Sequence, residues 1–217
     1  MQFDKKKFFD DYRARFGPIK DPKVVEGLDF LLDQIASDNG FTMIREVAYL
    51  LATIRGETGI FQPRREIRAN SAKQPKLWNI QQKYWPSGFF GRGYVQITHR
   101  DNYLNAGNKL KGITIDVPNN DGSTRQVVID RNTFINEPNL VMQPIAAYLI
   151  ASRGMREGWF RSRPNGRAYK LSDFIQEGTP PDYVSARNII NSPKDRAGEF
   201  ASFAEKFELC LRAAQTS

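Results

Sequence analysis

The chain has 217 residues, and its 32 Lys and Arg against 24 Asp and Glu give a formal net charge of +8. Hydrophobic residues make up 40% and aromatic residues 12%, which is enough apolar material for a folded domain and too much for a disordered basic tail. One Cys and one His exclude an intrachain disulfide and a His/Cys zinc site. The longest apolar run, residues 145–151, is far shorter than the ~18 residues that a membrane-spanning helix needs.

Helical periodicity dominates the first third of the chain. Aromatic residues at helical spacing predict a helix that reaches residue 16 and is stopped by Gly17 and Pro18. Asp21 and Pro22 are typical of the N-cap and first residue of a second helix, whose apolar residues recur up to residue 35. Charged residues also occupy positions 4–7, where a secretory signal would carry its apolar region, so we expect no cleaved signal.

A third helix is expected to lead directly to a carboxylate. Thr42 is its expected N-cap, and Glu46 is explained by a capping box with Thr42. Apolar residues recur at core spacing up to residue 54, and the pattern ends at the glycine-rich turn 56–59. This places Glu57 where a buried helix meets a turn.

The rest of the chain is also mostly helical by pattern. Residues 89–98, with aromatic and β-branched side chains and two glycines, predict a loop that enters a short strand. Residues 113–130 alternate around an Asp-Gly turn and predict a β-hairpin inserted in a helical domain. Further helical segments are expected over residues 140–155, from Ser172, from Pro181, and over residues 197–211.

No repeat or flexible linker divides the sequence. We therefore predict one mainly α domain over residues 1–217, in which residues 1–40 are a helical N-terminal part of the same domain.

Two glutamates in the central window suggest acid-base chemistry. Glu57 and Glu66 are separated by Gly59 and Pro63, which make a continuous helix between them improbable. The chain can instead turn and let the two carboxylates face each other across a groove. Glycosidic hydrolysis needs one protonated and one ionised carboxyl group. Spacing alone does not establish such a pair, since a chain with 24 acidic residues contains many.

The residues that follow resemble a family signature. The sequence Glu-Thr-Gly-x-Phe begins at Glu57, and Phe-Gly-Arg-Gly-x-x-Gln-Ile-Thr-x-x-x-Asn-Tyr spans residues 90–103. Together they resemble glycoside hydrolase family 19, which contains the lysozyme-like chitinases and the phage and prophage endolysins related to them. The resemblance is strong over residues 40–105 and weaker over residues 186–200. It implies an α+β lysozyme-like fold with a short strand region beside a sugar-binding cleft.

The resemblance also implies roles for individual residues. Glu57 would be the general acid, Glu66 the general base, and Thr98 would hold the nucleophilic water with Glu66. Family 19 enzymes invert, so the two carboxyl groups are predicted to stand about 6.5–9.5 Å apart. Arg196 is expected to pair near the carboxylates. The residues expected to bind the sugar chain are Tyr94, Gln96, Asn102, Asn191 and Arg196. The chain departs from the family at Gly56, where a His is common.

The implied activity is that of an endolysin. It would hydrolyse the glycan strands of bacterial peptidoglycan between N-acetylmuramic acid and N-acetylglucosamine and cause cell lysis. The alternatives are a chitinase and a non-catalytic binder of polyanions or cell wall. We expect accumulation in the host cytoplasm with release to the periplasmic wall. We also expect a monomer without cofactor, metal, nucleic-acid partner or stable membrane insertion.

Several of these side chains also have simpler interpretations. Glu57 could form a surface ion pair, and Glu66 could belong to a solvated cluster with the arginines of residues 64–68. His99 is expected at the surface, and Cys210 is expected to be an inert core thiol. Sugar-stacking and core roles are both open for Tyr84, Trp85, Phe89, Phe90 and Tyr94.

The positive charge is concentrated in two segments. Residues 61–84 and residues 153–170 each carry a net charge of +5, which leaves −2 for the remainder. Trp159 lies in the second segment. With the arginines around it, Trp159 could bind an acidic polymer, or it could be a core residue surrounded by basic surface side chains. We interpret both segments as electrostatic guidance toward an anionic cell wall.

Overall fold

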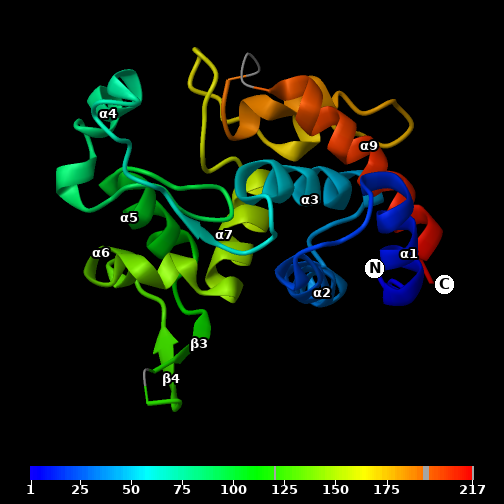
Figure 1. Cartoon of the computed structure of the whole chain (residues 1–217), viewed down its shortest axis with the longest axis horizontal. Coiled ribbons are helices and arrows are strands. Elements are labelled where there is room, and N and C mark those ends of the chain that lie inside the picture. The colour runs from blue at the N-terminus through cyan, green and yellow to red at the C-terminus, as the bar shows by residue number, and fades with distance from the viewer. Residues whose placement is uncertain (120, 193–195, 217) are drawn as a thin grey trace. The chain divides into compact units, whose positions relative to one another are not determined.

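A computed structural model describes residues 1–119, 121–192 and 196–216. The chain forms two compact units, unit 1 from Met1–Gln62 with Ala151–Ser217 and unit 2 from Pro63–Ile150. The elements of unit 1 are helices, and unit 2 combines helices with short antiparallel strands, which confirms the mainly α fold class (Figure 1). The single-domain organisation stays a prediction.

Unit 1 is organised around a buried helix, α3 (Ile44–Thr58). Helix α9 (Ala197–Ala214) packs along α3, and α1 (Lys5–Phe16) packs on α9. Helix α2 (Pro22–Ser37) contributes a further apolar face. Most side chains of α3 are buried, as expected for a helix that has neighbours on several sides.

The helix ends agree with the sequence patterns in most places. Gly17 ends α1 at a φ of +87°, and the Asp21 carboxylate accepts a hydrogen bond from a backbone amide in the first turn of α2. The N-cap prediction for α3 was wrong by one residue, since Met43 is the N-cap and Thr42 lies outside the helix. Glu46 is the cause, because its carboxylate accepts the backbone amides of both Thr42 and Met43.

The predicted helix over residues 140–155 is broken in two. Residues Pro138–Met142 form the 3-10 helix η2, and α7 (Pro144–Glu157) begins after it. Pro144 causes the break because it lacks an N–H and favours an extended conformation at the preceding Gln143, whose ψ is 130°. Helix α7 belongs to unit 2 as far as Ile150 and to unit 1 from Ala151.

Short helical pieces complete unit 1. The two predicted from Ser172 and Pro181 are present, although the second begins slightly later, after the N-cap Asp182. The bounds are Leu171–Asp173 for η3, Tyr183–Ala186 for α8 and Arg187–Ile189 for η4.

Unit 2 carries the strands. Strands β1 (Arg64–Arg65) and β2 (Arg92–Gly93) pair antiparallel, so that Arg64 lies opposite Gly93. The expected strand in residues 89–98 is thus limited to two residues. The helical elements of this unit are α4 (Pro75–Gln81), η1 (Trp85–Ser87), α5 (Arg100–Lys109), α6 (Thr133–Asn136) and η2.

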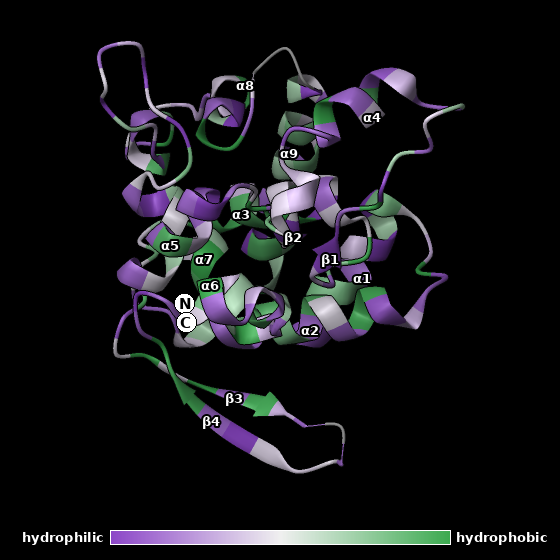
Figure 2. Ribbon diagram, turned by 90° about the vertical axis from the view of Figure 1, so that its left-hand side faces the viewer, coloured by the Kyte–Doolittle hydropathy of each residue, from purple (hydrophilic) through white to green (hydrophobic). Residues whose placement is uncertain are grey.

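The hairpin predicted over residues 113–130 is confirmed. Strands β3 (Thr114–Pro118) and β4 (Thr124–Val128) pair in antiparallel register, with Thr114 opposite Val128. Burial alternates along β3, and hydrophilic and hydrophobic residues follow one another in the hairpin (Figure 2). Asn120, in the predicted turn, lies outside the described residues.

No helix among the described residues has both the length and the apolar character needed to cross a membrane.

Candidate active site

Glu57 lies in the last turn of α3, on the side of a helix that is otherwise deeply buried. Gly59 follows as the C-cap with a φ of +75°, a conformation that suits glycine and lets the chain leave the helix. The Glu57 side chain is 20% exposed. The α3 core therefore fixes the backbone of a carboxylate that solvent can still reach.

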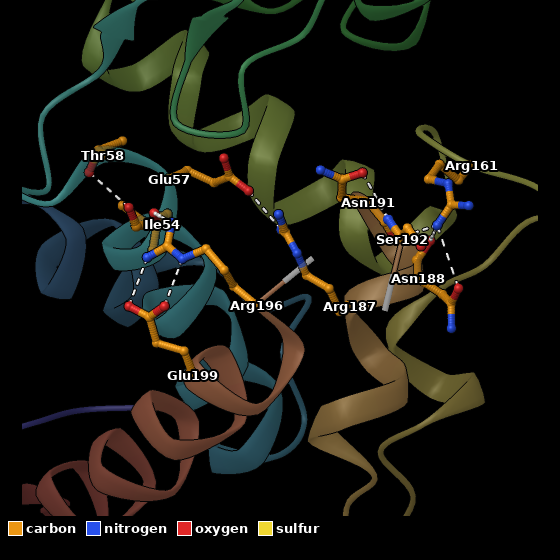
Figure 3. Close-up of polar contacts among 11 residues, drawn as sticks. Ile54, Glu57, Thr58, Arg161, Arg187, Asn188, Asn191, Ser192, Arg196 and Glu199 are labelled. Carbon is orange, nitrogen blue, oxygen red and sulfur yellow. Dashed lines mark hydrogen bonds and ion pairs between the residues drawn. The ribbon is translucent and has the colours of Figure 1, made fainter. Parts of the chain in front are cut away.

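A buried arginine holds this carboxylate. Nη1 of Arg187 donates to Oε1 of Glu57 over 2.6 Å, and the Arg187 side chain is only 2% exposed (Figure 3). The guanidinium also lies 4.0 Å from the ring centroid of Phe200. A buried cation needs an anionic partner to offset its lost hydration, and Glu57 supplies it. The interpretation of Glu57 as a member of a surface ion pair was wrong, because its partner is buried.

The sequence prediction assigned this electrostatic role to Arg196. Arg196 instead forms a two-pronged ion pair with Glu199, with N–O distances of 2.6 and 2.7 Å, and its Nη1 donates to the Gly56 carbonyl over 3.4 Å (Figure 3). The reason is local, since Glu199 is three residues along the start of α9. Arg187 was missed although it lies in residues 186–191, the segment quoted for its asparagine.

The glycine at position 56 has a packing reason. A Cβ at Gly56 would run into the ring of Phe200, which is fully buried. The ring in turn contacts the guanidinium groups of Arg187 and Arg196. The departure from the family pattern at position 56 thus allows Phe200 to pack against the end of α3.

Asn191 lies at the edge of the same region. Its side-chain oxygen accepts the Ser192 amide over 2.8 Å, and its carbonyl accepts a hydrogen bond from Arg161, which also donates to the Asn188 carbonyl (Figure 3). Residues 193–195 lie outside the described residues. The role of Asn191 in sugar binding stays a prediction.

Two polar residues that the sequence analysis missed lie on the same face of α3 as Glu57. Thr53 and Tyr49 precede it by one and two helical turns, and both are buried. Their hydroxyl oxygens have no hydrogen-bond partner among the described residues. Burial raises the pKa of Tyr49 above its ordinary value, and the positive charge of Arg187 opposes that increase. The helical spacing of the three residues was the available signal.

Glu66, in unit 2, is held by neutral donors. Its Oε1 accepts the Tyr84 hydroxyl over 2.6 Å and the Gln81 amide over 2.9 Å, while Oε2 accepts the Gly91 backbone amide over 2.8 Å. A Cβ at Gly91 would approach Glu66 to 3.2 Å, so the glycine allows this close contact. Burial, followed by the hydrogen bond to Glu66, raises the pKa of Tyr84, which keeps the phenol protonated as a donor.

The arginines around Glu66 contact aromatic rings. Arg68 lies over Trp78 and Trp85, with centroid distances of 4.3 and 4.8 Å, and Arg65 lies 4.7 Å from Phe90. The interpretation of Glu66 as the centre of a solvated ion-pair cluster was wrong, because neutral groups hold its carboxylate.

The signature segment forms a tight turn after β2. Gln96 has a φ of +54°, and its side chain donates to the carbonyls of Arg64 and Gly93 over 2.7 and 2.8 Å. Thr98 donates from Oγ1 to the Gln96 carbonyl, and Asn102 donates to the Thr98 carbonyl over 2.6 Å. All three side chains shape the turn, and their contacts with water or sugar stay predictions.

Arg92, at the centre of the signature, is part of the scaffold. It is buried and donates to Asn139 and to the Tyr103 hydroxyl over 3.0 and 2.8 Å. Tyr94 is also buried, which favours a core role over the expected contact with sugar. Among the other aromatic residues left open, Phe90 is buried, whereas Tyr84, Trp85 and Phe89 are half-buried.

Three other side chains have the structural roles considered in the sequence analysis. His99 is exposed and meets the Tyr84 ring edge-on, with centroids 5.3 Å apart. Cys210 is buried, and burial raises its pKa to about 11, so it is an inert core thiol at neutral pH. Trp159 is buried and donates to Glu157, which agrees with a core anchor.

Comparison with protein-family models, curated proteins and solved structures found no significant match. Glu57 belongs to unit 1 and Glu66 to unit 2, and the predicted separation of their carboxyl groups stays a prediction.

Proposed function

We propose that the chain is a lysozyme-like glycoside hydrolase that cleaves the glycan strands of bacterial peptidoglycan by an inverting, two-glutamate mechanism. The observation that carries the proposal is the contrast between two carboxyl groups. Glu57 is held by a buried cation, whereas Glu66 is held by three neutral donors. Carboxyl groups in different environments are suited to opposite acid and base roles.

Glu57 is proposed as the general acid. Arg187 contacts Oε1, and Oε2 accepts no hydrogen bond from the described residues, so this oxygen is available to protonate the leaving glycosidic oxygen. Glu57 is ionised in the ion pair with Arg187, so the acid step requires that it first take up a proton from solvent, which its 20% exposure allows; transfer of that proton to the glycosidic oxygen then restores the ion pair. This arrangement favours the transition state because the charge that develops meets a preorganised partner.

Glu66 is proposed as the general base. Two donors occupy Oε1 and one occupies Oε2, and because a carboxylate has about four acceptor positions, Oε2 can still accept a water molecule. The water would attack the anomeric carbon on the face opposite the leaving group, with Thr98 as its second contact. Inversion then requires about 6.5–9.5 Å between the two carboxyl groups.

The charge distribution favours peptidoglycan over chitin as substrate. The charge of +5 on residues 61–84 suits an anionic wall polymer, whereas chitin is uncharged; in residues 153–170, Arg156 pairs with Asp38, and Arg163 and Arg167 pair with Asp173. On this proposal the protein accumulates in the host cytoplasm and acts on the periplasmic wall after release. Chitin hydrolysis remains the second candidate, supported by the resemblance of the signature segment.

Product analysis tests the proposal. Purified peptidoglycan and colloidal chitin are each incubated with the wild type and with three variants, Glu57→Gln, Glu66→Gln and the exposed control Glu205→Gln. The released fragments are identified by mass spectrometry. We expect fragments with reducing-end N-acetylmuramic acid from the wild type and Glu205→Gln only. Anhydro-muramyl products would contradict the proposed hydrolysis. Release of chitin oligomers alone would show that chitin, and not peptidoglycan, is the substrate. Undiminished cleavage by Glu57→Gln would contradict the role of Glu57 as the general acid.

A further inference from the structure

Unit 2 carries exposed aliphatic side chains on the segment that follows Glu66. Among the residues that the structure describes, six large hydrophobic side chains are exposed, and three of them lie between residues 67 and 80. Ile67 is 74% exposed, Ile80 54% and Leu77 40%. Helix α4, which carries two of them, stands apart from α5 and α6 (Figure 1).

Lysines border these aliphatic side chains. Lys76 lies one helical turn before Ile80, so these two side chains share the outward face of α4, and the exposed Leu77 lies at the border of this face, one turn before the buried Gln81. Lys73 and Lys83, both exposed, lie just before and just after the helix. We call these five residues, together with Ile67, the α4 patch.

The one acidic residue of residues 61–84 does not neutralise the patch. It is Glu66, and its carboxylate already accepts hydrogen bonds from Gln81, Tyr84 and Gly91. The lysines of the patch therefore present a net positive charge next to exposed hydrocarbon.

The inner face of α4 is anchored independently of the patch. Gln81 is fully buried, accepts the Ala69 amide over 2.7 Å and donates to the Ile67 carbonyl over 2.9 Å. Trp78 lies against the Arg68 guanidinium, 4.3 Å from it. The outward aliphatic side chains thus contribute little to holding the helix in place.

We propose that the α4 patch docks on the surface of an anionic phospholipid bilayer. Leu77 and Ile80 would enter the boundary between headgroups and acyl chains, and the lysines would meet the lipid phosphates. The aliphatic side chains favour lipid over a sugar polymer, because sugars stack on aromatic faces, and over a soluble polyanion, which needs charge alone. The contact is shallow, since α4 has seven residues.

Vesicle binding by the full chain tests this inference, which does not rest on the glycosidase proposal. Co-sedimentation is measured with phosphatidylcholine vesicles that contain phosphatidylglycerol and with pure phosphatidylcholine vesicles. We expect binding to the anionic vesicles that weakens as salt is added. Leu77→Gln/Ile80→Gln should weaken it about ten-fold, and Lys76→Gln/Lys83→Gln by a similar factor of about ten.

The matched control is Val184→Gln/Leu209→Gln, which removes two equally exposed aliphatic side chains from unit 1 and should leave vesicle binding unchanged. Circular dichroism melting checks that the variants fold. Quenching of tryptophan fluorescence by brominated lipid provides a second measurement on the wild type. The proposal would be overturned by equal vesicle binding of all variants or by no binding to either kind of vesicle. It would also be overturned if the protein bound heparin as strongly as vesicles and Leu77→Gln/Ile80→Gln left heparin binding unchanged.

Discussion

The carboxylate of Glu57 in unit 1 depends on one buried cation, whereas that of Glu66 in unit 2 depends on several neutral groups from its own surroundings. Arg187 has almost no contact with solvent, so water cannot replace the Glu57 carboxylate if this residue is changed. Tyr84, Gln81 and Gly91 lose only one hydrogen bond each if Glu66 is changed. Electrostatic pairing therefore fixes one proposed catalytic group, and hydrogen-bond geometry fixes the other.

The largest expected effect comes from removing the Glu57 charge without removing its partner. Glu57→Leu should lower the free energy of unfolding by about 3 kcal/mol, because the buried Arg187 guanidinium loses the carboxylate that its Nη1 contacts over 2.6 Å. The double variant with Arg187→Met should recover part of this loss, since the buried guanidinium is removed together with the carboxylate that contacts it. Urea unfolding of the two single variants and the double variant gives the coupling energy. Additive single effects would contradict the charge dependence.

Packing at the end of α3 should give the next largest effect. Gly56→Ala should destabilise the protein by about 2 kcal/mol, because the added Cβ meets the Phe200 ring beneath Arg187. Gly198→Ala is the control, since it is also helical and its Cβ would meet no atom of the described residues within 4 Å. There the better helix propensity of alanine should stabilise by about 0.5–1 kcal/mol. Thermal unfolding distinguishes the two, and equal shifts would refute the packing argument.

A smaller effect is expected in unit 2. Tyr84→Phe removes one of three donors to Glu66 and should cost about 1.5 kcal/mol, the usual contribution of a hydrogen bond to a partly buried charged group. Chemical unfolding measures the loss. A loss as large as that of Glu57→Leu would remove the distinction between the two carboxylates.

The pH dependence of this last difference should be the smallest effect. The pKa of Tyr84 is raised in the folded protein, so the folded state holds the proton more tightly than the unfolded chain. Its contribution is full below the unfolded pKa of about 10 and is lost as pH rises through the higher folded value. The stability difference between wild type and Tyr84→Phe should therefore be constant from pH 7 to about 9 and shrink above about pH 10. A stability difference between wild type and Tyr84→Phe that grows with pH would indicate that folding lowers the pKa of Tyr84.

Most helices of unit 1 could be predicted because local rules decide them, whereas α4 and α5 of unit 2 were not predicted. Gly17, the Asp21 cap and the Asp-Gly turn of the hairpin act within a few residues, and all three are confirmed. The errors arose where a competing local group intervened. Glu46 took the amides that define the start of α3, and Pro144 broke a periodic helix.

The partners of the candidate site were harder to predict because they are distant in sequence. Arg187 reaches Glu57 across 130 residues, and nothing local distinguishes it from Arg196. Gln81 and Tyr84 reach Glu66 from a segment whose composition reads as polar loop. The glycines at positions 56 and 91 marked the candidate site, but the sequence did not show why glycine is needed there. The tertiary contacts show that a side chain at Gly56 would meet Phe200 and one at Gly91 would meet Glu66.

The central claim, that Glu57 and Glu66 act as acid and base in an inverting hydrolysis, is tested most directly by the configuration of the product. The protein cleaves soluble β-linked glycan fragments of peptidoglycan while the reaction is followed by proton NMR spectroscopy. The anomeric signals of the product are recorded before mutarotation. The account predicts that the new reducing end appears first as the α-anomer and that neither Glu57→Gln nor Glu66→Gln produces it. A β-anomer formed first, or no cleavage by the wild type, would contradict the account.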